Sequence, residues 1–199
     1  MDPLWSFVFG NDHPVEIEIG PGRGDVLLAF AAARPEVNFF GIEHVQGTAE
    51  RLTARLGAAG VTNARVIGGD ATCVVRHLVP SASIARYHVY FPDPWPKRRH
   101  HRRRVFTEDF VAALRRSLVA GGSVHVATDL EWLYETIDAA LVSGGFRRHR
   151  DAVAPPRPTT RFERKYASAG TYAGGYVVGS YPTAAWSVGA ASPSPQKNS

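Results

Sequence analysis

Five acidic side chains recur where an apolar run of the sequence ends or is about to end. They are Glu18, Glu43, Asp70, Asp93 and Asp129. A carboxylate accepts hydrogen bonds from hydroxyl, amine and ring N–H groups, and it stabilises positive charge that develops during a reaction. If the apolar runs are strands of one parallel sheet, these side chains share its carboxyl edge, where ligands of such folds bind. The pattern therefore indicates a polar binding site at one edge of an α/β fold.

The first of these acids lies in a glycine-rich segment, "EIGPGRG", at residues 18–24. This segment has glycine at every second position: Gly20, Gly22 and Gly24. Glycine permits a tight turn and leaves room for a ligand to approach the backbone. Glu43, 25 residues after Glu18, can accept hydrogen bonds from ribose hydroxyls. The alternative is an ordinary tight turn between a strand and a helix.

The glycine-rich loop alone does not decide whether the cofactor is NAD or S-adenosylmethionine. Two further features separate these alternatives. The spacing is G-x-G-x-G and not the G-x-G-x-x-G that wraps a pyrophosphate, and this favours S-adenosylmethionine. A third apolar run also ends in an acid, Asp70, which can bind an adenine amino group. Asp70 could instead cap the helix predicted at 72–78, and the two roles are compatible.

The segment "FPDPW" at 91–95 follows the fourth predicted strand. Its two prolines fix the backbone angle φ, so Asp93 is presented rigidly at the sheet edge. Trp95 offers a flat face on which a base can stack. The alternative is a simple Asp-Pro bend with a core tryptophan.

A dense basic run follows at once, with six cations between Lys97 and Arg104. The whole chain has a net charge of +5, so this one segment accounts for all of its excess positive charge. Such a focus suits a polyanion that docks at one place. We expect Arg99, Arg102, Arg103 and Arg104 to contact the phosphates of such a polyanion. A solvated basic loop is the alternative on charge alone.

Apolar runs that alternate with helical segments predict a parallel sheet covered on both faces. Strands are expected at 14–20, 37–43, 64–70, 83–94, 123–129 and 175–181, and helices at 25–35, 45–60, 72–78, 106–122, 131–145 and 159–170. Thr107 is the expected cap of its helix, whose apolar stripe runs from Phe110 to Leu118. We expect a single domain over 1–185 and a disordered tail over 186–199.

The composition of the chain limits which classes of protein it can belong to. The chain has 199 residues, of which 44% are hydrophobic, enough for one full core. No apolar run approaches the roughly 20 residues of a membrane span, and the first residues carry acid where a signal peptide carries base. Cys73 is the only cysteine, so no disulfide within the chain and no cysteine metal cluster is expected. A cytoplasmic protein without a metal or a membrane partner is the plain reading.

Taken together, these segments resemble the bacterial tRNA (guanine-N7)-methyltransferase family over about residues 4–170. The resemblance rests on "LWSFVFGNDHPVEIEIGPGRG", "FFGIE", "GDA", "FPDPWPKRRHHRRR", "ATD" and "TRFE", in that order. It implies a doubly wound, mostly parallel, seven-stranded sheet of the class I methyltransferase type, with S-adenosylmethionine as the methyl donor and tRNA as the substrate. The expected target is the variable-loop guanosine at position 46.

The resemblance also implies roles for particular residues. Asp93 would be catalytic, and the cofactor would be held by Glu18, Gly20, Gly22, Gly24, Glu43, Asp70 and Asp93. The tRNA guanosine would be bound by Lys97, Asp129, Thr160, Arg161, Phe162 and Glu163. From the residues alone, Asp129 could equally cap the next helix, and 160–163 could be an exposed helix start.

Two other functions remain open at this point. A methyltransferase of the same fold could act on a small amine or a purine-like metabolite, and a non-catalytic relative could only bind RNA. The six cations argue against the first, and the intact acids argue against the second. Either a monomer or a weak homodimer is expected.

Overall fold

The structure, a computed structural model, describes residues 2–95, 105–149 and 170–178. The strands in these ranges are β1 (Val15–Ile19), β2 (Asn38–Glu43), β3 (Ala64–Gly68), β4 (Ile84–Tyr90), β5 (Leu118–Thr128), β6 (Phe146–Arg148) and β7 (Tyr172–Val178). The helices are α1 (Pro3–Phe9), α2 (Asp25–Ala33), α3 (Gln46–Ala58), α4 (Ala71–His77), α5 (Glu108–Ser117) and α6 (Glu131–Ser143).

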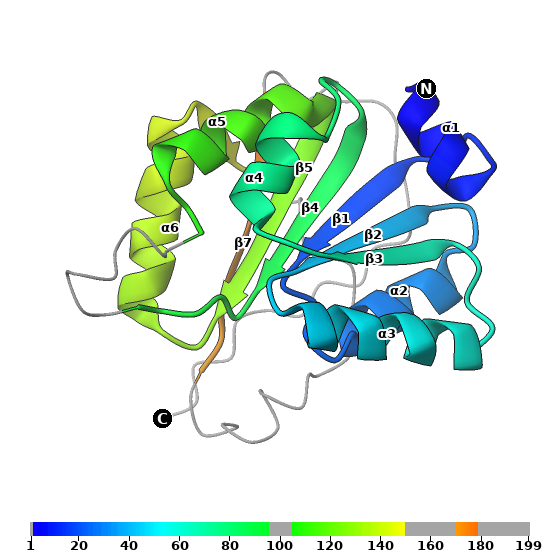
Figure 1. Cartoon of the computed structure of the whole chain (residues 1–199). Coiled ribbons are helices and arrows are strands. Elements are labelled where there is room, and N and C mark those ends of the chain that lie inside the picture. The colour runs from blue at the N-terminus through cyan, green and yellow to red at the C-terminus, as the bar shows by residue number, and fades with distance from the viewer. Residues whose placement is uncertain (1, 96–104, 150–169, 179–199) are drawn as a thin grey trace.

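All seven strands form one sheet in the order β3-β2-β1-β4-β5-β7-β6 (Figure 1). Strands β1 to β5 pair in parallel, and β7 runs antiparallel to both β5 and β6. The chain order reverses between β1 and β4, and the carboxyl ends of these strands face the place where a doubly wound sheet binds its ligand. The expected doubly wound, mostly parallel, seven-stranded sheet is confirmed.

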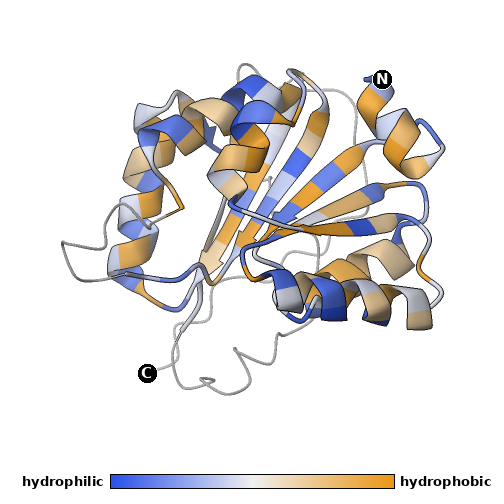
Figure 2. Ribbon diagram, viewed as in Figure 1, coloured by the Kyte–Doolittle hydropathy of each residue, from blue (hydrophilic) through white to orange (hydrophobic). Residues whose placement is uncertain are grey.

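Helices cover the sheet on both faces (Figure 1). On one face α2 and α3 enclose a core that includes Leu27, Phe30 and Leu52. On the other, α1, α4, α5 and α6 pack over a larger core around β1, β4 and β5. Figure 2 shows hydrophilic residues inside β1, β4 and β5 among the apolar ones, which a purely apolar core would not contain.

The sequence located most elements correctly, but several boundaries differ: the strand expected over 83–94 spans Ile84–Tyr90, and the strand expected over 175–181 begins at Tyr172. Thr107 caps α5 as expected, since its hydroxyl accepts from the backbone N–H of Phe110. The helix expected over 106–122 ends at Ser117, however, and β5 begins at Leu118 rather than at Ser123. The physical reason is pairing: Leu118 is extended and lies opposite Ile84 of β4, which removes it from the helix.

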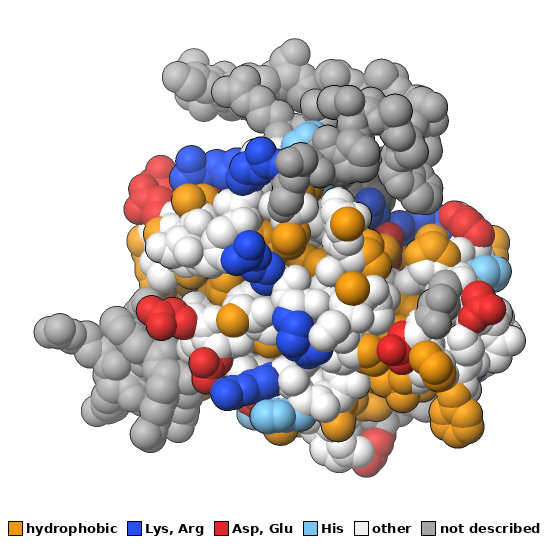
Figure 3. Space-filling view, turned by 90° about the horizontal axis from the view of Figure 1, so that it is seen from above, with side chains coloured by type: hydrophobic (Ala, Val, Ile, Leu, Met, Phe, Trp, Pro, Cys, Tyr) orange, Lys and Arg blue, Asp and Glu red, His pale blue; other side chains and the backbone are white. Residues whose placement is uncertain are grey.

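Two short elements were missed from sequence, α1 and β6. In α1, Asp2 caps the first turn, Trp5 and Phe9 are buried, and Phe7 is 88% exposed. Figure 3 shows apolar side chains standing out on the right of the view, the side on which α1 lies in Figure 1. A seven-residue helix and a three-residue strand are too short to show a clear period.

The helix expected at 159–170 and the tail expected at 186–199 lie outside the described residues. In the part of the chain that is described, no helix is both long and apolar enough to cross a membrane.

Candidate active site

The glycine-rich loop between β1 and α2 adopts a conformation that requires its glycines. Gly20, Gly22 and Gly24 have φ angles of +67°, +55° and +76°, in the left-handed region that side chains disfavour. A Cβ on Gly20 or Gly22 would meet no heavy atom within 4 Å, so the backbone there is open to approach. At Gly24 a Cβ would lie 2.2 Å from Leu52 Cδ1, so this glycine also lets α2 and α3 pack closely.

Glu43, the last residue of β2, is tied to this loop. Its Oε2 accepts from the backbone N–H of Gly22 at 2.9 Å, and its Oε1 accepts from the N–H of Val45 at 3.0 Å. The side chain is 8% exposed. Each carboxylate oxygen keeps a second lone pair, so Glu43 can hold the loop and still accept from a ligand hydroxyl. The sequence predicted the acid but not its bonds to the loop.

Glu18 and Asp70 occupy the carboxyl ends of the strands on either side of Glu43 in the chain. Glu18 is buried, 5% exposed, on β1. Asp70 follows β3, is exposed, and caps α4 by accepting from the N–H of Cys73 at 2.8 Å. The capping alternative for Asp70 is therefore confirmed, and its second oxygen is left for the role in cofactor binding that remains a prediction.

Asp93 is exposed in the turn after β4, and this turn has an unusual backbone. Phe91 and Trp95, on either side of it, have φ angles of +51° and +38°. A positive φ at a bulky aromatic residue is a genuine outlier, and such strain of about 1–3 kcal/mol gathers at functional sites. Phe91 donates its N–H to the carbonyl of Ala127 on β5 at 2.7 Å, which fixes the start of the turn.

Asp129 follows β5 at the same edge and is half-buried. It is not the cap of α6, because that position belongs to Leu130, which makes no side-chain capping bond. The capping alternative for Asp129 is thus wrong. Since β1 to β5 are parallel neighbours, the predicted placement of the five acids at one sheet edge is confirmed, while their roles remain predictions.

The rest of the predicted site lies outside the described residues. This applies to Lys97, Arg99, Arg102, Arg103, Arg104, Thr160, Arg161, Phe162 and Glu163.

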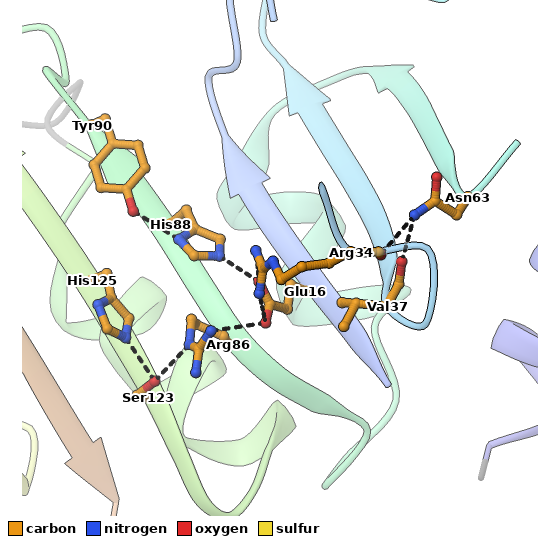
Figure 4. Close-up of polar contacts among 9 residues, drawn as sticks. All are labelled: Glu16, Arg34, Val37, Asn63, Arg86, His88, Tyr90, Ser123 and His125. Atoms are coloured by element: carbon orange, nitrogen blue, oxygen red, sulfur yellow. Dashed lines mark hydrogen bonds and ion pairs between the residues drawn. The ribbon is translucent and has the colours of Figure 1, made fainter. Parts of the chain in front are cut away.

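The sequence reasoning missed a buried polar network on the α2 side of the sheet (Figure 4). Its centre is Glu16 of β1, which accepts two hydrogen bonds from Arg34, one from Arg86 and one from His88, all at 2.8–2.9 Å. Burial alone would raise the pKa of Glu16, but the His88 hydrogen bond and the nearby cations outweigh it and lower the pKa to about 2. The available signal was polar residues at alternate positions, Glu16 with Glu18 and Arg86 with His88, inside apolar strands.

The geometry of the edge suits S-adenosylmethionine. A loop of positive-φ glycines with open space above Gly20 and Gly22 lets an amino-acid or ribose moiety approach the backbone. Carboxylates at Glu18, Glu43 and Asp70 supply acceptors for ammonium, hydroxyl and adenine amino groups. Asp93 adds negative charge beside them, which can balance a cation formed on a substrate ring.

Comparison with known proteins identifies close sequence relatives. A family model described as "Putative methyltransferase" matches residues 12–173. The tRNA (guanine-N(7)-)-methyltransferase of Psychromonas ingrahamii is 41% identical over 172 residues, which cover 85% of this chain and 70% of the relative. The protein of the same name from Vibrio cholerae is 41% identical over 169 residues, which cover 81% and 70%.

Solved structures share the fold at low identity. The 16S rRNA methyltransferase KamB superposes with a TM-score of 0.66 at 14% identity, covering 89% of this chain and 94% of its own. The aminoglycoside resistance methyltransferase NpmB1 gives a TM-score of 0.62 at 16% identity, covering 87% and 91%. These likenesses establish the fold.

Proposed function

The chain belongs to the tRNA (guanine-N7)-methyltransferase family, and we propose that it transfers a methyl group from S-adenosylmethionine to guanine N7 of tRNA, at the variable-loop guanosine 46. The observation that carries the proposal is the row of acids at the carboxyl edge beside a glycine loop open to a ligand. The relatives named above, 41% identical over most of the chain, supply the substrate class.

When bound, S-adenosylmethionine supplies an electrophilic methyl group. Glu43 would hold the ribose while it keeps the glycine loop in place, and Asp70 would accept from the adenine amino group. Glu18, with the backbone around Gly20 and Gly22, would hold the amino-acid end. These residues bind and orient, so their contribution is to bring the reacting atoms into line.

Guanine N7 carries its own lone pair, so no base has to remove a proton before attack. Methylation leaves a positive charge on the purine ring, and the exposed carboxylate of Asp93 would stabilise that charge as it develops. Carboxylates such as Asp129 can accept from the guanine N1–H and amino groups, which adenine cannot offer in the same pattern. Lys97 and residues 160–163 would complete the guanosine site.

The partner is proposed to be tRNA, held through phosphate contacts by the basic run Lys97–Arg104. We propose that residues 1–185 work as one cytoplasmic domain, as a monomer or a weak homodimer. The sheet already joins residues as far apart as 15 and 178.

The function is tested by methyl transfer from labelled cofactor to unmodified tRNA, compared with free guanosine and nucleotides. Label in tRNA that maps to N7 of guanosine 46 is the expected result, and a tRNA with adenosine at position 46 should take up none. Transfer only to free guanosine or to a small amine would favour the metabolite alternative. Tight tRNA binding without transfer would favour an RNA-binding relative.

The cofactor placement is tested separately by calorimetry of Glu43→Ala. We expect S-adenosylmethionine to bind about tenfold more weakly or worse, because a charge-assisted hydrogen bond is worth roughly 1.5–3 kcal/mol. Glu50→Ala is the matched control, since Glu50 lies exposed on α3 and contacts Gln46. Equal cofactor affinity in both variants would exclude Glu43 from the cofactor site.

A further inference from the structure

A continuous chain of hydrogen bonds links the middle of the sheet to the end of β4 (Figure 4). Tyr90 Oη lies 2.8 Å from His88 Nδ1, and His88 Nε2 lies 2.8 Å from Glu16 Oε2. His88 is 1% exposed and Tyr90 is 8% exposed, so this chain is screened from water. Nothing in the proposed chemistry uses these groups, and Tyr90 is the last residue of β4, three positions before Asp93.

The donor and the acceptor of each hydrogen bond in this series follow from the protonation states of Glu16 and His88. Glu16 has a pKa of about 2, so it is ionised and can only accept, and His88 must donate through Nε2. Burial lowers the pKa of His88, although the hydrogen bond to Glu16 opposes this, so the imidazole is neutral. Its Nδ1 is then an acceptor, and the Tyr90 hydroxyl must donate to it. The hydrogen bonds from Tyr90 to His88 and from His88 to Glu16 therefore have a single donor–acceptor pattern, and this pattern orients the Tyr90 ring.

Glu16 itself is held by cations from two parts of the chain. Arg34, just after α2, gives it two hydrogen bonds of 2.9 Å, and Arg86 of β4 gives a third. The Arg34 guanidinium also lies 4.7 Å from the ring centres of Phe30 and Phe39. The anchor of Tyr90 is thus built from β1, β2, β4 and α2 together.

The turn beyond Tyr90 needs such an anchor. Its backbone is strained at Phe91 and Trp95, which both have positive φ, and strained conformations persist only where the surroundings hold them. The N–H of Phe91 is held by Ala127 of β5. That bond holds the backbone at the start of the turn, and the side chain of Tyr90, the residue before it, is held by the hydrogen bond to His88.

We propose that Tyr90, through His88 and Glu16, is a positioning residue that fixes the Asp93 turn for methyl transfer. The inference rests on the proposed role of Asp93, and it adds to that role the device that holds the carboxylate in place. Tyr90 does not touch the reacting atoms. Its hydroxyl acts through the backbone, so its loss lowers the transfer rate and leaves cofactor binding intact.

The fold offers a matched control in the same strand. Tyr87, three residues before Tyr90, is fully buried and bonds Ser117 through its hydroxyl at 2.7 Å, but it faces the opposite side of the sheet. Tyr90→Phe and Tyr87→Phe each remove one buried hydroxyl from β4. A merely structural role predicts similar effects of the two changes, whereas a positioning role predicts different ones.

Two measurements separate these outcomes. In hydrogen exchange of the intact protein, Tyr90→Phe should speed exchange of the Phe91 amide at least about fivefold, and Tyr87→Phe should not. With tRNA and labelled cofactor, Tyr90→Phe should lower kcat about tenfold with KM for the cofactor unchanged, because small misplacements of a catalytic group cost rate. Tyr87→Phe should stay within about twofold of the parent in kcat.

His88 supplies a rescue test. Glutamine can donate to Glu16 and accept from Tyr90 as the imidazole does, so His88→Gln should keep most of the rate, and His88→Leu should lose it. Equal rates of hydrogen exchange at the Phe91 amide in Tyr90→Phe and Tyr87→Phe would overturn the inference. This holds even if the wild-type protein transferred no methyl group to tRNA. A parent enzyme active on tRNA whose Tyr90→Phe variant kept full kcat would also overturn it, with the proposed function intact.

Discussion

Asp93 is an exposed carboxylate at the end of a central strand, held in a turn whose backbone is strained on both sides. An exposed acid in such a turn contributes little to packing, so its value lies in the charge that it presents. Asp93→Asn keeps the shape of the side chain and removes this charge. We expect the transfer rate to fall roughly 10²–10³-fold, as when one preorganised electrostatic group is lost.

The measurement for Asp93→Asn is the single-turnover rate with saturating cofactor and tRNA, which separates chemistry from binding. The melting temperature should change little. Asp109→Asn is the control, because Asp109 is an exposed carboxylate on α5 paired with Arg76 at the surface. An Asp93 variant with a near-normal rate, or one that unfolds, would make this acid a structural turn residue.

At the level of elements, the loop that enters α2 depends on one glycine for two reasons. Gly24 has a φ of +76°, and a Cβ there would lie 2.2 Å from Leu52 Cδ1 on α3. Gly24→Ala should therefore lower the free energy of unfolding by about 1–3 kcal/mol, through backbone strain and overpacking. Urea unfolding measures the change.

Gly57→Ala is the matched control for this prediction. Gly57 lies inside α3, and a Cβ there would meet nothing within 4 Å. Alanine is the better helix former by up to about 1 kcal/mol, so this variant should be as stable as the parent or more so. If Gly24→Ala were equally harmless, the close packing of α2 against α3 would not depend on that glycine.

Sequence alone located the strands of the central sheet because each is a short apolar run bounded by turn residues. The acids at its edge were predictable for the same reason, since parallel strands bring their carboxyl ends together. The boundary at Leu118 was not, because its pairing with Ile84 is a contact between distant segments. The bonds from Glu43 to the loop also needed the folded backbone.

The buried network shows a second limit of the sequence. Glu16, Arg86 and His88 are polar residues in apolar strands, and a period of two cannot tell whether such residues face solvent or each other. In the structure they face α2, and Arg34 completes the set from a different segment. The location of the turn at 91–95 was predictable, but what holds it was not.

Across the whole molecule, the network makes stability depend on pH in one direction. Glu16 has a folded pKa of about 2 against an ordinary 4.5, so its ionised form stabilises the fold above pH 4.5, and this is lost as the pH falls toward 2. Burial also lowers the pKa of His88 and, further, of His125 below the ordinary 6.5. The unfolded chain then binds protons that the folded chain does not, so stability falls as the pH drops below 6.5.

The groups that face His88 come from several elements. They are Glu16 on β1, Arg34 after α2, Arg86 and Tyr90 on β4, and His125 on β5. We expect His88→Gln to flatten the fall in unfolding free energy from about pH 6.5 downward, by up to one proton or about 1.4 kcal/mol per pH unit. Urea unfolding across this range tests it, with His77→Gln, an exposed site on α4, as the control. Equal slopes in both variants would mean that His88 is not held neutral.

The positive charge of the protein is concentrated in one segment, and this predicts that tRNA binds there. Six cations lie between Lys97 and Arg104 in a chain of net charge +5. Alanine at Arg102, Arg103 and Arg104 should weaken tRNA binding and lower the slope of log affinity against log salt by up to about three, because fewer counterions are released.

The control variant has alanine at Arg65, Arg76 and Arg115, which are exposed on β3, α4 and α5, and it removes the same charge from the body of the protein. That control should change the slope far less, and cofactor affinity should be unaltered in both variants. An equal loss of slope in the two variants would mean that tRNA responds to total charge and does not dock on this segment.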